Sequence, residues 1–146
     1  MSVNSRVISA TPDQVWEILA DGWLYPVFVV GATRMRDVDA SWPETGSKLY
    51  HSAGVWPLIV SDNTEVLACE PRRHLRLRAR GWPMGEAEVD LTLAASGSGT
   101  RVEIREQLVS GPGRLMPTPA QDLMIKIRNN ETLRRLAFVA EHRGRA

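Results

Sequence analysis

The stretch TPAQDLMIKIRNNETLRRLAFVAEH, residues 118–142, decides the fold of this chain. It contains no glycine and no proline after Pro119, so it predicts a single long helix with Thr118 as its N-cap and Gln121 at capping-box spacing. At about 1.5 Å per residue the helix is roughly 36 Å long, which spans a small domain. A helix of that length needs a broad partner, and the segments before it alternate as strands do. The sequence therefore predicts a helix gripped by a curved antiparallel sheet.

The apolar residues of this helix form two patches rather than one continuous stripe. The first comprises Ala120, Leu123, Met124 and Ile127, and the second comprises Leu133, Leu136, Ala137 and Ala140. Asn129, Asn130 and Glu131 lie between the patches, where two different surfaces are expected to meet the helix. In one interpretation, Asn130 or Glu131 faces a partly hydrated cavity between helix and sheet. In the other, both face solvent where the stripe drifts around the helix.

Length and charge indicate one domain, residues 1–146, with room for a pocket. A chain of 146 residues buries roughly 68–70% of its unfolded surface, which supports a single core. The net charge is +1 with acidic and basic residues interspersed, so no binding surface for nucleic acid is expected. Arg76, Arg78 and Arg80 alternate with Leu75 and Leu77, which is typical of the solvated face of a strand.

Cysteine usage and hydropathy favour a soluble, cytoplasmic protein. Cys69 is the single cysteine of the sequence, so an intramolecular disulfide is excluded and a reducing compartment is favoured. The N-terminus lacks the basic and apolar regions of a signal peptide. Residues 23–32 are the most apolar run, but Pro26 interrupts it and it is too short to cross a bilayer, so no membrane insertion is expected. We expect a monomer or a homodimer.

The rest of the chain predicts two short helices followed by strands. Residues 2–10 alternate as a strand, Thr11 caps a helix over 12–20, and a second short helix lies within 23–32. Beyond residue 35 the helical repeat gives way to the strand repeat. The predicted strands cover residues 35–39, 48–55, 58–69, 73–80, 86–93 and 100–109. This order is an α+β layout, in which a curved antiparallel sheet of about six to seven strands wraps around the long C-terminal helix.

Five segments of the sequence carry a family resemblance. They are VISATPDQVWEILAD, WPETGSKLYHS, DNTEVLACEPRRHLRLRARG, GSGTRVEIREQLVSGPG and RNNETLRRLAFVAE, and together they cover nearly the whole chain. The chain resembles the SRPBCC superfamily, whose START-like, helix-grip fold includes polyketide cyclase/dehydratase-like proteins. The segments are a helix cap, hairpin turns and alternating strands, with no catalytic signature. Because the superfamily contains ligand carriers, chaperone-like proteins and enzymes, the resemblance implies an internal apolar cavity and no particular reaction.

Glu106 is the first candidate for chemistry. In the predicted strand 100–109 it is in phase with Val102, Ile104 and Leu108, so its side chain is expected to point toward the apolar interior. Burial disfavours a charged carboxylate, which is how general acids and bases are tuned. The alternative is a buried ion pair or a backbone hydrogen bond that serves only the fold.

Three polar residues on two other predicted strands pose the same question. Asp62 and Thr64 are in phase with Val66, so this polar pair is expected to face the cavity beside Glu106. His51 is a second catalytic candidate, as a base or as a group that orients a ligand. The alternative for His51 is a packed or surface histidine without a role in chemistry.

Large aromatic residues gather on the short helices and at strand ends, where the mouth of a cavity is expected. The predicted entrance consists of Trp16, Trp23, Tyr25 and Phe28, and Trp56 is a further ligand-binding candidate at a strand end. Leu123, Met124 and Ile127 are expected to form one wall, with Glu106 or Asn130 as a polar contact. The alternative for the aromatic residues is ordinary core packing.

The sequence predicts no cofactor and no metal site, because its histidines and cysteine lack ligand spacing and no glycine loop suits a phosphate. The leading hypothesis is a protein that binds a small, mostly hydrophobic molecule, either lipid-like or resembling an aromatic polyketide. A second hypothesis is a polyketide cyclase/dehydratase-type enzyme that uses the same cavity. A third is a partner-binding protein with a vestigial cavity. The sequence leaves open whether the protein is an enzyme.

Overall fold

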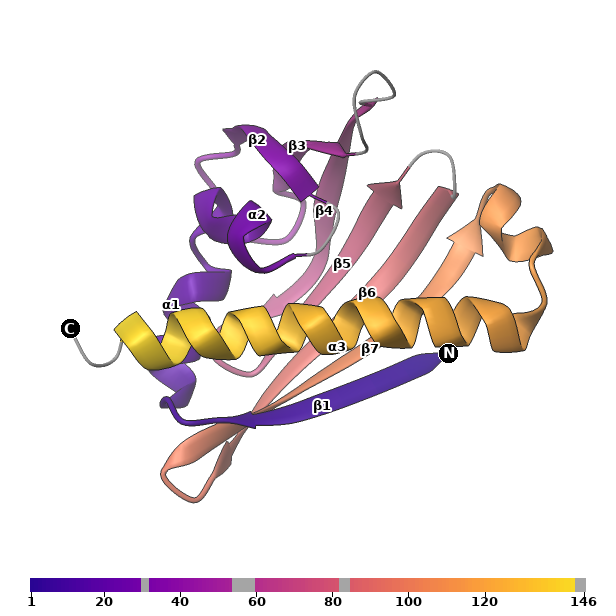
Figure 1. Cartoon of the computed structure of the whole chain (residues 1–146). Helices are drawn as coiled ribbons and strands as arrows, with labels where there is room; N and C mark the ends of the chain where they lie inside the picture. The colour runs from indigo at the N-terminus through magenta and orange to yellow at the C-terminus, as the bar shows by residue number, and fades with distance from the viewer. Residues whose placement is uncertain (30–31, 54–59, 82–84, 144–146) are drawn as a thin grey trace.

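The N-terminal strand runs into two short helices, and the chain then builds a sheet and ends in one long helix (Figure 1). The structure is a computed structural model that describes residues 1–29, 32–53, 60–81 and 85–143. Its elements are β1 (Ser2–Ile8), α1 (Pro12–Leu19), the 3-10 helix η1 (Gly22–Leu24), α2 (Tyr25–Phe28), β2 (Ala32–Val38), β3 (Lys48–Ala53), β4 (Val60–Glu70), β5 (His74–Gly81), β6 (Gly85–Ser96), β7 (Gly99–Ser110), the 3-10 helix η2 (Pro112–Leu115) and α3 (Thr118–Arg143).

One antiparallel sheet holds all seven strands in the order β1-β7-β6-β5-β4-β3-β2. Sequential strands from β2 to β7 are neighbours, and a short turn at Gly97, with φ of 59°, joins β6 to β7. Twist accumulates across such a meander, and Figure 1 shows the sheet curving around one side of α3. The predicted helix-grip architecture is confirmed.

The start of α1 follows the predicted capping chemistry. The backbone N–H of Gln14 donates to the Thr11 hydroxyl over 3.2 Å, and the Thr11 N–H donates to Gln14 Oε1 over 2.9 Å. This reciprocal pair satisfies donors that a helix start leaves without partners. The cap fixes the direction in which the chain leaves β1, so α1 lies over one end of the sheet (Figure 1).

The start of α3 differs from the prediction by one residue. Thr118 lies inside the helix, and the carbonyl of Pro117 accepts hydrogen bonds from the N–H groups of Ala120 and Gln121 at 2.9 and 3.1 Å. The side-chain amide of Gln121 donates to the carbonyl of Met116 over 2.6 Å, so it does not form a capping box with Thr118. The turn that enters the helix thus uses backbone carbonyls where the sequence predicted a threonine hydroxyl.

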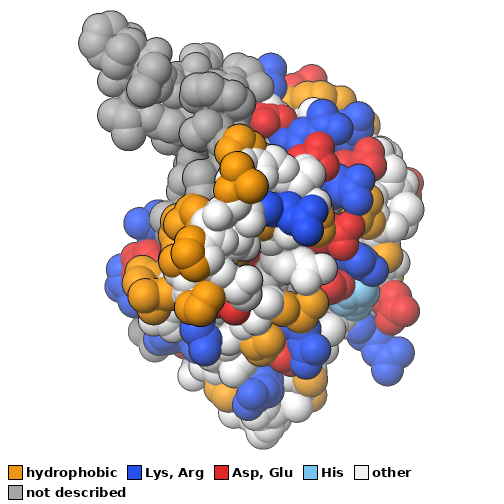
Figure 2. Space-filling view, turned by 90° about the vertical axis from the view of Figure 1, so that its right-hand side faces the viewer, with side chains coloured by type: hydrophobic (Ala, Val, Ile, Leu, Met, Phe, Trp, Pro, Cys, Tyr) orange, Lys and Arg blue, Asp and Glu red, His pale blue; other side chains and the backbone are white. Residues whose placement is uncertain are grey.

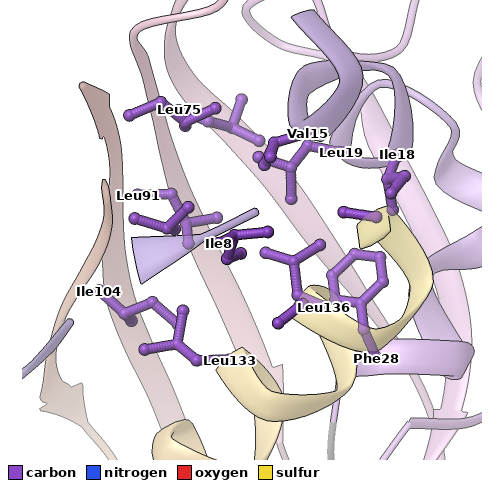
Figure 3. Packing of buried hydrophobic residues seen from close by; sticks show 14 of the residues in the cluster. Ile8, Val15, Ile18, Leu19, Phe28, Leu75, Leu91, Ile104, Leu133 and Leu136 are labelled. Atoms are coloured by element: carbon purple, nitrogen blue, oxygen red, sulfur yellow. The ribbon is translucent and has the colours of Figure 1, made fainter. Parts of the chain in front are cut away.

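The core lies between the sheet, α1 and the C-terminal half of α3. Figure 3 shows Leu133 and Leu136 of α3 pointing toward Ile8, Val15 and the inner face of the sheet. The buried positions of α3 form one stripe: Ile125, Asn129, Thr132, Leu133, Leu136, Ala137 and Ala140. The second predicted patch therefore packs on the sheet as expected, and a single stripe continues from it toward the N-terminal end of the helix.

The first predicted patch of α3 faces away from the sheet. Leu123, Met124 and Ile127 are 61%, 41% and 65% exposed, so the prediction that they form an inner wall is wrong. The reason is the helical repeat: residues on the same face as Leu133 lie at Asn129 and Ile125, and Ile127 falls on the opposite face. Figure 2 views the end of the molecule that contains η2 and the first turns of α3. Hydrophobic side chains, in orange, gather on part of this end.

The outer face of the sheet carries paired charges. Arg76 and Arg78 of β5 contact Glu88 of β6 at 2.7 and 2.9 Å, and Arg80 contacts Glu86 at 2.9 Å. These arginines form the solvated face of a strand, as predicted. Their charge is offset by the neighbouring carboxylates. Among the described residues, no helix has both the length and the apolar character needed to span a membrane.

Candidate functional site

Glu106 is buried on the inner face of β7, where it meets the middle of α3. Its side chain is 4% exposed and lies two residues from the buried Ile104, on the same face of the strand. Arg128 Nη2 donates to Glu106 Oε2, and the amide of Asn129 donates to Oε1 over 3.2 Å. The inward orientation predicted for Glu106 is confirmed, and both of its carboxylate oxygens have partners on α3.

This ion pair joins α3 to β7, and further hydrogen bonds join α3 to the adjacent strand β1. Ser2, whose backbone lies opposite Glu106, donates from its hydroxyl to the carbonyl of Asp122 over 3.0 Å. The side chain of Asn4 donates to the carbonyl of Lys126 over 2.9 Å. A buried charge is tolerated when it is paired and hydrogen-bonded, so Glu106 is suited to holding the helix in place. A catalytic or ligand-binding role for Glu106 stays a prediction.

A second polar group lies on the same inner face, on β3, β4 and α2. His51 Nε2 and the Thr64 hydroxyl are 2.9 Å apart, and Thr64 also acts on the pKa of the nearby Tyr25. The ring of Tyr25 is stacked near that of His51, with centroids 6.0 Å apart and planes at 21°. His51 is 5% exposed and Thr64 is fully buried. Tyr25, Thr64 and His51 therefore lie together inside an apolar region, and we call these three side chains the polar chain.

One atom of this chain lacks a partner. His51 Nδ1 is screened from solvent, and it makes no hydrogen bond. A buried polar atom left unpaired typically costs about 1–3 kcal/mol, so such atoms are uncommon in folded proteins. Burial lowers the pKa of His51 from its ordinary value of 6.5, although nearby Asp62 acts in the opposite direction. The imidazole is therefore neutral at pH 7, with one nitrogen able to donate and the other able to accept.

The Tyr25 hydroxyl connects the two polar groups electrostatically. Burial raises the pKa of Tyr25 above its ordinary value of 10, Thr64 opposes this rise, and the charges of Glu106 and Arg128 also act on it. Tyr25 is therefore protonated and neutral at pH 7. The ring of Phe28 packs edge-to-face on Tyr25 with centroids 5.9 Å apart, which holds the phenol over the inner face of the sheet.

The structure brings together four residues that the sequence proposed for the site: Tyr25, His51, Thr64 and Glu106. Asp62 is half-buried and in phase with Thr64, and its Oδ1 accepts the N–H of Asn63 over 2.9 Å. The predicted aromatic entrance does not assemble as a whole. Phe28 is buried in the core, Trp16 is half-buried against it, and Trp23 is 56% exposed on a different part of the surface. Trp56 lies outside the described residues.

Asn130 is exposed, so the prediction that it supplies a polar contact inside the molecule is wrong. Its neighbour Asn129 is 4% exposed and bonds to Glu106 instead. Sequence reasoning missed Asn129 and also missed the inward reach of Arg128, because it treated the polar run as a break between patches. The signal was present in the spacing, since Asn129 lies four residues before Leu133.

A shallow surface hollow of about 450 Å³ lies beside α1, away from the polar chain. It is lined by Glu17, Ala20, Asp21, Gly22, Trp23, Val38, Asp39, Ala40 and Trp42. Asp21 and Asp39 already accept backbone N–H groups, from Trp23 and Lys48 respectively. Within the described ranges, no group of three or more histidine, cysteine or acidic side chains is arranged to hold a metal ion.

Comparisons with solved structures agree with the fold. Ara h 8.0201 superposes with a TM-score of 0.73 at 10% identity over 96% of each chain. Protein NE0264 from Nitrosomonas europaea gives 0.75 at 15% identity, covering 99% of this chain and 96% of that one. The di-domain ARO/CYC StfQ from the steffimycin biosynthetic pathway gives 0.74 at 11% identity, covering 99% of this chain and 51% of that one. At these identities the likeness concerns the fold alone.

Sequence comparison gives the family. No curated protein sequence matches the chain. The family model described as polyketide cyclase / dehydrase and lipid transport matches residues 2–141, which agrees with the resemblance inferred from the five segments. Because the match spans nearly the whole chain, this protein belongs to the polyketide cyclase / dehydrase and lipid transport family.

Proposed function

We propose that this protein binds a small, mostly hydrophobic molecule between α3 and the inner face of the sheet. Membership of the family supports a hydrophobic ligand or a polyketide substrate in general terms. The observation that carries the proposal is local: the inner face holds a buried polar chain, Tyr25, Thr64 and His51, whose last nitrogen lacks a partner. A molecule that is mostly apolar with one polar group matches such a surface.

The inner face of the sheet is more exposed near Ala79 than near Leu75, and this difference supports a binding site near Ala79. Leu75 and Leu77 of β5 are 1% and 3% exposed, so this end of the sheet is closed by α1 and α3. Farther along the same face, Ala79 and Leu108 are half-buried, and so is Val89, which lies opposite Leu77. Strand register places Ala79 opposite Thr64, next to the polar chain. The region around Ala79 therefore combines reachable apolar surface with nearby hydrogen-bonding groups.

A second candidate function is a cyclase/dehydrase-type reaction at the same place, and the neutral His51 favours it. In the tautomer with the proton on Nε2, Nδ1 is a base. His51 Nδ1 would take a proton from a substrate carbon that lies between two carbonyl groups. The resulting carbanion would attack a further carbonyl group of the same substrate, and the alkoxide formed would take the proton back from Nδ1. Incubation with a linear poly-β-keto thioester tests this function, since cyclised or dehydrated products must appear in mass spectra and must disappear with His51→Phe.

The binding proposal is tested by fluorescence titration with 8-anilinonaphthalene-1-sulfonate as the probe. We expect saturable binding of one probe molecule per chain. In Ala79→Trp the larger side chain fills the inner face and should weaken binding at least tenfold. Ala94 is exposed on β6, so Ala94→Trp serves as the matched control and should bind as the unsubstituted protein does.

Near-UV circular dichroism verifies that both variants keep native packing, because molten states also bind this probe. Absence of saturable binding in the folded protein would contradict the proposal and favour a partner-binding role. Equal binding by both tryptophan variants would place the ligand elsewhere. Native mass spectrometry of the freshly purified protein, followed by organic extraction, would identify a molecule that copurifies with it.

A further inference from the structure

Buried polar atoms of the inner face differ in whether they have partners. Glu106 presents two carboxylate oxygens and each accepts a bond from α3. The Thr64 hydroxyl bonds to His51 Nε2. His51 Nδ1 has none, although the residue is 5% exposed. The inner face therefore has an unused hydrogen-bonding position at a defined place, on β3 beside the Tyr25 ring.

The His51–Thr64 bond has two internally consistent orientations. If the Thr64 hydroxyl donates to His51 Nε2, Nδ1 carries the proton. If His51 Nε2 donates to the Thr64 hydroxyl, Nδ1 is an acceptor. Both tautomers of a neutral imidazole are available. A hydroxyl group can accept and donate, so it can bond to Nδ1 in either orientation.

We infer that the bound molecule carries a hydroxyl group on an otherwise apolar body, and that His51 Nδ1 is the atom that bonds this hydroxyl. The inference rests on the proposed binding function and deepens it by naming the ligand class. The half-buried ring of Tyr25 lies nearly parallel to the imidazole, with ring centroids 6.0 Å apart, so an aromatic surface lies beside the unpaired nitrogen. Thr64 is a positioning residue, because it fixes the imidazole through Nε2.

The test compares two probes of similar size, 2-naphthol and 2-methylnaphthalene, which differ by a hydroxyl in place of a methyl group. Dissociation constants for both are measured with the unsubstituted protein, with His51→Phe and with Thr64→Val. The quantity of interest is the ratio of the two constants, because it cancels changes that affect both probes. We expect the preference for 2-naphthol to fall about tenfold in His51→Phe and by a smaller factor in Thr64→Val.

Matched controls use the same substitutions at exposed positions. His142 lies at the end of α3 and Thr92 on β6, and both are exposed. His142→Phe and Thr92→Val should leave the ratio unchanged. Thr64→Val keeps the side-chain volume nearly constant, so the inference stays testable even if His51→Phe fails to fold.

The possible results separate the inference from the proposed function. A ratio that falls only in the two inner-face variants supports the inference. Binding of both probes with an unchanged ratio in His51→Phe and Thr64→Val overturns the inference and leaves hydrophobic binding in place. Failure of the unsubstituted protein to bind either probe overturns the proposed function and the inference together.

Discussion

The inner face of the sheet contains two buried polar groups of opposite character. On β7, Glu106 is enclosed by Arg128 and Asn129, and each carboxylate oxygen has a partner. On β3 and β4, His51 and Thr64 share a hydrogen bond, and His51 Nδ1 remains unpaired. The first group is complete within the protein. The second has one position that only a further molecule can fill.

Whether a buried polar atom already has a partner distinguishes a residue that stabilises the fold from one that is available to bind a ligand. A carboxylate with both oxygens occupied gains nothing from a ligand, and a ligand that displaced Arg128 would leave a charge buried and unpaired. A neutral imidazole with one free nitrogen gains a hydrogen bond without losing any. Glu106 attracted attention in the sequence because it is charged, but the less conspicuous His51 is better placed to meet a ligand.

The comparison predicts the largest effect for Arg128→Ala. Glu106 would keep only the amide of Asn129, so a buried carboxylate would lose its counter-charge. We expect the free energy of unfolding to fall by about 2–4 kcal/mol, since Arg128 is itself 42% exposed and part of the site can hydrate. Urea denaturation at neutral pH measures this change.

Arg134→Ala is the matched control for this prediction. Arg134 also pairs with a carboxylate, Glu131, at 2.7 Å, but its side chain is 63% exposed. Exposed pairs of this kind contribute about 0.2–1 kcal/mol. If Arg128→Ala destabilises the protein no more than Arg134→Ala does, the Glu106 group is not the structural tie that its geometry indicates.

The second prediction concerns the pH dependence that His51 contributes. Because burial lowers its pKa from 6.5, the folded protein disfavours protonation, whereas the unfolded chain takes up the proton readily. The contribution of neutral His51 is therefore complete above about pH 6.5 and is lost as the pH falls toward the lowered pKa. The slope reaches at most about 1.4 kcal/mol per pH unit.

Urea denaturation of the unsubstituted protein and His51→Phe between about pH 5 and pH 8 tests this prediction. The difference between the two free energies of unfolding cancels the titration of groups that both proteins share. The stability of the unsubstituted protein relative to that of His51→Phe should decrease as the pH falls through the acidic part of the range. A difference that stays constant across the range would mean that His51 titrates as freely as it does in the unfolded chain.

Local sequence signals predicted the elements of the fold well. The Thr11 and Gln14 cap, the glycine turn at Gly97 and the alternation along β6 each depend on a few neighbouring residues, so they are legible without a structure. The Thr118 cap failed because the chain before α3 offered the carbonyl of Pro117 to the same N–H groups. That competition depends on backbone conformation, which residue types alone do not determine.

The candidate site was less legible because its contacts join distant segments. Strand phase correctly placed Glu106 and Thr64 on the inner face. The Glu106–Arg128 pair depends on how α3 is rotated, and the His51–Thr64 bond depends on the register between β3 and β4. The rotation of α3 about its axis was predicted wrongly because the sequence interpretation required an apolar residue at every inward position. Asn129 and Thr132 are polar and buried.

The third prediction compares two adjacent asparagines of α3, Asn129 on the buried side of the helix and Asn130 on the exposed side. Both substitutions, Asn129→Ala and Asn130→Ala, bring the same gain in helix propensity, so it cancels in the comparison. Asn129→Ala removes a buried bond to Glu106 and should cost about 1 kcal/mol more than Asn130→Ala, whose side chain is exposed. Equal unfolding free energies would mean that the Asn129 amide adds nothing to Glu106, leaving Arg128 as the sole support of the buried carboxylate.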